Sequence, residues 1–243
     1  MQPYRSPVFL SRLAIAGLAL SGVCRILYLV ASISMFFVPS RSFDLGDNDS
    51  LSLWELVLGL IALVFIPIFI FTVVTFLMWL YRTFTNLPAM RSDSNEFTPG
   101  WAVGWWFIPF ANLVKPYQAV RTVWSESDPD VSVDDTSFLS SVQAGAPAFL
   151  MIWWGVWIVG NIVSNVSNRI DVFAKPGLQS LGATVGVIES IIWIAGSVLA
   201  IKVVTSITDR QEQRHTKVGD VGFNEPPPPP TFSSGYNQQD GNI

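Results

Sequence analysis

The sequence predicts an all-α membrane protein, a bundle of four transmembrane helices, and three observations support this fold class. Half of the 243 residues are hydrophobic and only 13% are charged, whereas roughly a quarter are charged in soluble proteins. Four stretches are each apolar over about the 20 residues that a helix needs to cross a bilayer. Lysine and arginine are concentrated in the segments that flank these stretches on one side.

The first of these stretches begins after the basic residues Arg5 and Arg12, and it contains Arg25. A cleaved signal peptide is the alternative interpretation, but the apolar run exceeds the roughly 7–15 residues of a signal peptide. We therefore expect a retained helix. The fourth stretch contains Glu189. The predicted helices cover residues 13–37, 54–80, 146–166 and 183–206.

The distribution of basic residues predicts that both chain termini lie in the cytoplasm, with residues 1–12 as a cytoplasmic N-terminus. Lysine and arginine in short flanking segments mark the cytoplasmic side of a membrane protein. The side that we assign to the cytoplasm has Arg5, Arg12, Arg82, Arg91, Lys115, Arg121, Arg210, Arg214 and Lys217, whereas the other side has Arg41, Arg169 and Lys175.

The segment between the second and third helices does not fit a simple bundle. Residues 100–114 are apolar but too short to cross a bilayer, and Pro109 interrupts any helix there. Interrupted backbone cannot face lipid, because its free N–H and C=O groups would lack partners. Residues 100–124 are therefore predicted to form an interfacial or re-entrant segment, in which Trp101, Trp105 and Trp106 suit the headgroup boundary.

An amphipathic helix is expected to follow from Lys115, with Pro116 in its first turn. Tyr117, Val120 and Trp124 recur at helical spacing, which is typical of a helix lying on the inner leaflet. Asn112 is interpreted as the cap of this helix, and Lys115 as an anchor to lipid phosphates.

Residues 207–243 are predicted to form a disordered, proline-rich cytoplasmic tail. The tail contains five consecutive prolines, 226–230, which favour a polyproline II helix. The rest has too little apolar surface to offset the entropy cost of ordering. Polyproline segments bind aromatic-lined grooves, so a protein partner is one expectation for this tail.

Residues 79–82 and 97–117, with the run Trp-Phe-Ile-Pro-Phe-Ala-Asn-Leu at 106–113, resemble the core of an uncharacterised bacterial membrane family, domain of unknown function 4328. The tryptophans at 153, 154 and 157 also fit this family, and the resemblance covers about residues 54–205. It implies a bacterial source and a cell-membrane location, and it implies no activity.

Arg25 and Glu189 are the sharpest candidate site, because ionisable residues inside a membrane are costly and usually paired. Glu55 is a rival partner for Arg25. Three interpretations stay open: a structural ion pair, a substrate or proton site, and no contact. Asn161 either links helices by hydrogen bonds or binds a ligand. The tryptophans at 153, 154 and 157 form either the bundle core or an aromatic pocket.

The residue inventory argues against an enzyme. Cys24 and His215 are the single cysteine and histidine, so a Cys/His metal centre cannot be assembled, and we expect no cofactor. The chain has no phosphate-binding glycine motif. Its net charge of −4 argues against a nucleic-acid partner.

Two functions remain open. The first is a non-catalytic membrane interaction or scaffold protein, whose partners are membrane lipids and a protein bound by the proline-rich tail. The second is a small transporter or channel, formed by a homo-oligomer, with a polar path near Arg25, Glu189 and Asn161.

Overall fold

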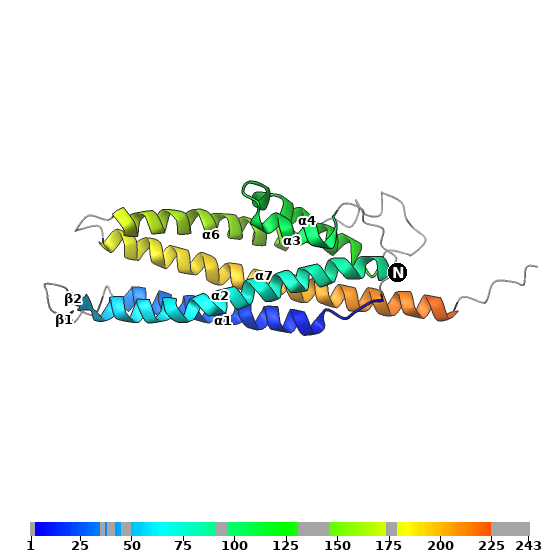
Figure 1. Ribbon diagram of the computed structural model, residues 1–243, viewed down its shortest axis with the longest axis horizontal. Coiled ribbons are helices and arrows are strands. Elements are labelled where there is room, and N and C mark those ends of the chain that lie inside the picture. Colours follow the sequence, from blue (N-terminus) through cyan, green and yellow to red (C-terminus); the bar gives the residue numbers. More distant parts are fainter. Residues whose placement is uncertain are drawn as a thin grey trace, which may run out of the picture.

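Four long helices run side by side in a computed structural model of the chain, and shorter helices pack along one side of the bundle (Figure 1). The structure describes residues 3–34, 37, 42–44, 50–90, 97–130, 146–173 and 179–224. All four helices are long and apolar enough to cross a membrane, as predicted, and the chain is a multi-pass membrane protein. They are α1 (Val8–Ser34), α2 (Leu53–Asn86), α6 (Ala148–Phe173) and α7 (Gln179–Asn224).

The helices form a row in the order α2, α1, α7, α6, because α1 packs against both α2 and α7, and α7 packs against α6. Small residues allow this close packing. A Cβ atom at Gly17 of α1 would lie 2.7 Å from the Oγ1 atom of Thr72 on α2. Helices α2 and α6 are therefore the two ends of the row.

Two short strands, which the sequence analysis did not predict, lie between α1 and α2 at one end of the bundle (Figure 1). Strand β1 (Ser42–Asp44) pairs with β2 (Ser50–Ser52) in antiparallel register, with Ser42 opposite Ser52. Residues 38–41 and 45–49 of this connection lie outside the described residues.

Residues 99–126, which we call the hairpin, pack against α2, α6 and α7. The predicted interfacial or re-entrant segment is thus present, and it joins the two ends of the helix row. The chain reverses direction at Pro109 and at Phe110, whose φ of 65° is positive. The hairpin consists of α3 (Pro99–Gly104), η2 (Trp105–Phe107), η3 (Ala111–Leu113) and α4 (Lys115–Glu126).

The predicted start of a disordered tail at residue 207 is wrong, because α7 continues without interruption to Asn224. The side chains of Ile207, Gln211 and Arg214 are buried against the end of α2, the short helix η1 (Leu87–Met90) and the end of α4. These side chains recur at helical spacing, and their burial holds the polar helix in place. The five prolines at 226–230 lie outside the described residues.

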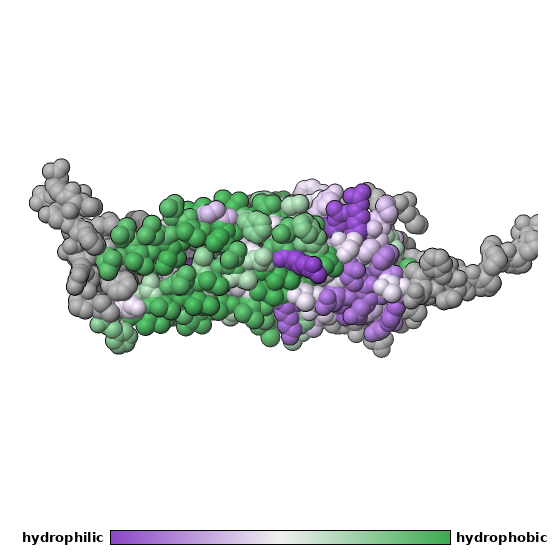
Figure 2. Space-filling model, turned by 90° about the horizontal axis from the view of Figure 1, so that it is seen from below, coloured by the Kyte–Doolittle hydropathy of each residue, from purple (hydrophilic) through white to green (hydrophobic). Residues whose placement is uncertain are grey.

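The surface changes character along the bundle axis. On the face in Figure 2, a hydrophobic band adjoins a hydrophilic end that holds the last described part of α7. We call this the polar end, formed by residues 3–7, 79–90, 121–130 and 203–218. Its core is dense, and its fully buried side chains include Trp79, Leu80, Met90, Ile207 and Gln211.

Candidate functional site

The structure brings together the two intramembrane charges that the sequence analysis paired. Arg25 Nη1 donates a hydrogen bond to Glu189 Oε1 over 3.3 Å, which joins α1 to α7. The same Oε1 atom accepts a 2.7 Å hydrogen bond from the hydroxyl of Ser164 on α6. The side chain of the rival partner, Glu55, lies outside the described part of the chain.

A cavity of about 470 Å³ lies beside this pair, lined by residues of the four long helices and the hairpin. The Arg25 guanidinium forms part of its wall, with Cζ 4.8 Å from the centroid of the Phe65 ring. Phe69 and Phe107 also line the cavity, and they are 52% and 68% exposed on the surface of the bundle. The cavity therefore reaches the lipid-facing surface between α2 and the hairpin.

The wall of the cavity is mostly aromatic and aliphatic, with a few polar groups. Asn112 of the hairpin and Asn161 of α6 face it together with Arg25. The aromatic side chains of the wall are Phe65, Phe69, Phe76, Trp106, Phe107, Trp153, Trp157 and Trp193.

Both interpretations of the tryptophans on α6 are partly correct. Trp153 and Trp154 are buried, with 3% and 6% of their surface exposed, so they form core. Trp153 and Trp157 also line the cavity. Trp106 of the hairpin packs edge-to-face on the rings of Trp154 and Trp157, at 5.9 Å between centroids in each case. The hairpin is thus fixed to α6 by aromatic contacts.

Asn161 does not link helices through its amide nitrogen, as one interpretation of it required. Its Nδ2 donates to the carbonyl of Trp157 in the same helix, at 2.8 Å. The reason is local, because an amide side chain in a helix can reach a carbonyl of the preceding turn. Asn161 remains a polar group of the cavity wall.

The predicted site residues of the hairpin differ in exposure. Trp101 is 53% exposed and lies against Trp105, with 4.8 Å between ring centroids. The Nζ atom of Lys115 lies 6.0 Å from the centroid of Trp105. Pro109 lies at the reversal, and Trp106 packs inward against α6.

The expectation that Asn112 caps α4 is wrong. The residue that caps α4 is Val114, which makes no side-chain cap bond, and Asn112 lies within η3. The Oδ1 atom of Asn112 and the Nε1 atom of Trp106 are both buried, and neither has a hydrogen-bond partner among the described residues. Pro116 occupies the first turn of α4, as predicted.

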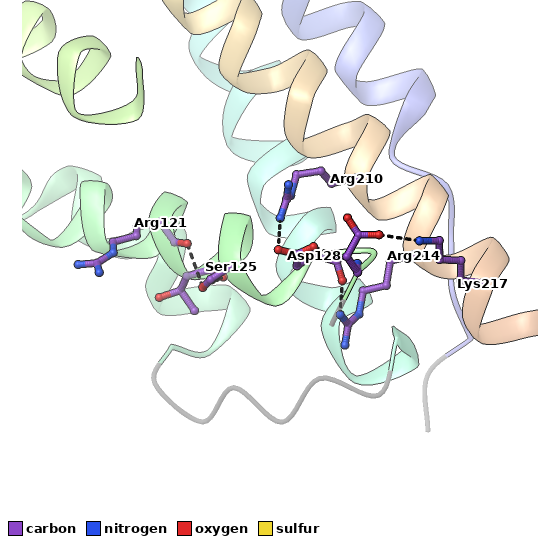
Figure 3. A network of polar contacts seen from close by, with 8 residues as sticks. Arg121, Ser125, Asp128, Arg210, Arg214 and Lys217 are labelled. Atoms are coloured by element: carbon purple, nitrogen blue, oxygen red, sulfur yellow. Dashed lines mark hydrogen bonds and ion pairs between the residues drawn. The ribbon is translucent and has the colours of Figure 1, made fainter. Parts of the chain in front are cut away.

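A second polar cluster, which the sequence analysis missed, ties α4 to α7 at the polar end (Figure 3). The carboxylate of Asp128 lies 2.8 Å from Nη2 of Arg210, and its backbone carbonyl accepts a bond from Arg214. Lys217 pairs with Asp130 over 2.8 Å, and this contact lowers the pKa of Asp130 below its usual range. The helical spacing of 207, 211 and 214 was the signal for this packing in the sequence.

The N-terminal segment is held at the same end. The ring of Tyr4 stacks on His215 at 3.8 Å, and its hydroxyl donates to Glu212 at 3.0 Å. Burial and the neighbouring Glu212 raise the pKa of Tyr4 well above its usual value. His215 therefore has a packing contact here. Within the described ranges, no group of three His, Cys, Asp or Glu residues is placed to hold a metal ion.

Comparison with known proteins identifies one family. The model of a family described as a domain of unknown function, DUF4328, matches residues 45–209. No curated protein and no solved structure matches the chain. The matched range includes α2, the hairpin, α6 and the part of α7 that faces the cavity, whereas the whole of α1 precedes it.

Proposed function

The chain belongs to the DUF4328 family, and we propose that it is a non-catalytic membrane protein that binds a lipid molecule in the cavity between α2 and α6. The observation that carries this proposal is the aromatic-walled cavity of about 470 Å³ that reaches the lipid-facing surface at Phe69 and Phe107. Ligand sites of roughly 300–1,000 Å³ with apolar walls and a few polar groups are typical of small-molecule binding.

The position of the opening favours a ligand from the bilayer over one from water. Phe69 at the opening lies in the second membrane-spanning helix, so a water-soluble ligand would have to lose its hydration before it entered. A lipid already lies at that depth. The hairpin contributes a cation for headgroups nearby, because Lys115 has no carboxylate within 4.0 Å among the described residues.

Two matched variants test whether the cavity holds lipid. Val73 lines the cavity, whereas its neighbour Val74 is 49% exposed on the lipid-facing surface. We expect Val73→Phe to fill part of the cavity and lower the amount of lipid retained through purification, measured by native mass spectrometry. Val74→Phe adds the same bulk outside the cavity and should retain lipid as the unmodified chain does. Equal retention by both variants would refute the proposal.

A transporter or channel is the second candidate, because Arg25 and Asn161 place polar groups in the wall of one cavity. In this case the protein would move a solute across liposome membranes. Transport would be favoured if solute flux is lost both when Arg25 is substituted and in Val73→Phe. Lipid retention without flux in liposomes of the purified protein would favour binding alone.

We also propose that the protein lies in a bacterial cell membrane with its polar end in the cytoplasm, as the predicted positive-inside distribution requires. Accessibility tests this orientation. After Cys24→Ser, a cysteine at the exposed Gln213 should react with a membrane-impermeant reagent only in opened cells. A cysteine at Phe37, which is 81% exposed, should react in intact cells. The reverse pattern would overturn the orientation.

Partner binding by the proline-rich tail is a further proposal from the sequence. Truncation after Asn224 removes residues 225–243 and leaves the described part of α7 intact. Loss of specific co-purifying proteins on this truncation would identify the tail as a scaffold element. Unchanged co-purification would show that it is a spacer.

A further inference from the structure

We propose that the ligand of the cavity is an uncharged lipid whose carbonyl oxygen accepts a hydrogen bond from Arg25. This inference rests on the proposed function, because it assigns a chemical class to the ligand of the same cavity. It follows from the hydrogen-bond donors of Arg25 that do not bind Glu189, from the charge balance at the cavity wall and from the aromatic side chains of that wall.

Arg25 has N–H donors beyond the one that binds Glu189. A guanidinium carries five N–H donors, and a single bond, from Nη1 to Glu189, is present among the described residues. The Arg25 side chain lines the cavity and keeps 23% of its surface accessible. Its remaining N–H groups can therefore meet an acceptor atom of a ligand, at the end of the cavity beside Phe65 and Trp193.

The charge balance excludes an anionic headgroup. Arg25 and Glu189 together are neutral, and among the described residues that line the cavity Arg25 is the one that is charged. A carboxylate or phosphate would bring an uncompensated negative charge into the membrane interior, and such a charge is expensive there. A neutral carbonyl can accept a hydrogen bond from the arginine without adding net charge.

The apolar wall favours an apolar body behind that carbonyl. Rings of Phe76, Trp153 and Trp157 form flat surfaces against which an acyl chain or a planar ring can pack. Two classes of membrane molecule combine a neutral carbonyl with such a body. One is an isoprenoid quinone, and the other is a diacylglycerol with ester carbonyls.

The experiment measures binding of three tritiated probes to the full chain in nanodiscs: decylubiquinone, dioctanoylglycerol and decanoate. We expect at least one neutral probe to bind more tightly than decanoate. The tighter of the two neutral probes identifies the source of the carbonyl. Val73→Phe should weaken binding of that neutral probe.

A charge-free variant tests the role of Arg25. Arg25→Met combined with Glu189→Gln removes both charges and leaves no unpaired ion, so the fold is retained. We expect it to bind the neutral probe about tenfold more weakly, the size of one hydrogen bond from a charged donor. Arg12→Met, at an exposed position of α1, is the matched control and should bind as the unmodified chain does.

The outcomes separate this inference from the proposed function. Decanoate binding as tightly as the neutral probes, or full affinity in the charge-free variant, would overturn the carbonyl assignment. If Val73→Phe still lowers lipid retention in that case, the lipid cavity stands and only the assigned class fails. If Val73→Phe changes neither retention nor probe binding, both fail together.

Discussion

The membrane-spanning part of the bundle and its polar end satisfy their polar groups in different ways. In the membrane, one ion pair between Arg25 and Glu189 lies beside a cavity, and most large apolar side chains of α2 face outward. At the polar end, fully buried Gln211 donates to the Thr83 carbonyl and to Ser127 and accepts a bond from Asn86. The membrane-spanning part has a cavity between its helices, whereas the polar end has buried side chains between its helices.

This difference shows where each region derives its rigidity. Helices in lipid gain little from apolar burial, because lipid tails are as apolar as leucine. They associate through close contacts such as Gly17 on Thr72, and they tolerate a cavity. The polar end has a hydrophilic surface. Burial of Trp79, Leu80 and Ile207 there removes apolar surface from water and so contributes directly to stability.

The largest expected effect breaks the ion pair in the membrane. Arg25→Met leaves Glu189 without its counter-charge, and we expect a loss of about 3 kcal/mol in the free energy of unfolding. The double variant Arg25→Met with Glu189→Gln should recover most of this loss. Unfolding in mild detergent, followed by circular dichroism, measures both, and equal stability of the single variant and the unmodified chain would contradict the prediction.

The next effect tests the polar end. Gln211→Leu removes the hydrogen bonds that Gln211 makes to Asn86, the Thr83 carbonyl and Ser127 in a buried core, at a cost of about 2–3 kcal/mol. Gln213→Leu changes the same residue type at an exposed position of α7 and should be close to neutral. Thermal unfolding of the two variants side by side is the measurement. A neutral Gln211→Leu would mean that the network contributes no stability.

A smaller effect tests the close contact of α1 and α2. Gly17→Ala places a Cβ atom 3.0 Å from the Thr72 Cα atom, so the helices must shift apart, and we expect a loss of about 1–2 kcal/mol. Gly59→Ala meets no atom within 4 Å and should be neutral or slightly stabilising. The midpoint of denaturant unfolding in detergent compares the two. An unchanged midpoint for Gly17→Ala would show that this contact is loose.

The smallest effect concerns the exposed pair of Asp130 and Lys217. Lys217 lowers the pKa of Asp130, so the pair adds stability at pH values above the ordinary aspartate pKa of about 4. This stability is lost as the pH falls through the lowered pKa of Asp130. Lys217→Met should raise the pKa of Asp130 toward its ordinary value, as read from the NMR titration of its carboxyl group. Lys217→Arg should keep it low, and an unchanged pKa in Lys217→Met would assign the shift to another group.

The sequence predicts the four helices well, because an apolar run of about 20 residues is a strong signal for a membrane span. It predicts their ends poorly. Hydropathy reports contact with lipid, so it ended the fourth helix at 206, whereas the helix continues to Asn224 through residues buried against protein. The same limit placed the end of the second helix at 80, although α2 continues to Asn86.

The candidate site was predictable only in part. The rarity of charges in apolar runs pointed to Arg25 and Glu189, and Pro109 predicted the break in the hairpin. The cavity was not predictable, because its wall combines residues from α1, α2, the hairpin, α6 and α7 that no local pattern connects. The positive φ of Phe110, an aromatic residue, also has no signal in the sequence.

The unbroken course of α7 has a structural consequence. This single helix of 46 residues carries Trp193 at the cavity and Gln211 in the polar end, about 27 Å apart along its axis. It contains no proline to absorb bending. The same helix therefore contributes both to the wall of the cavity and to the buried core of the polar end.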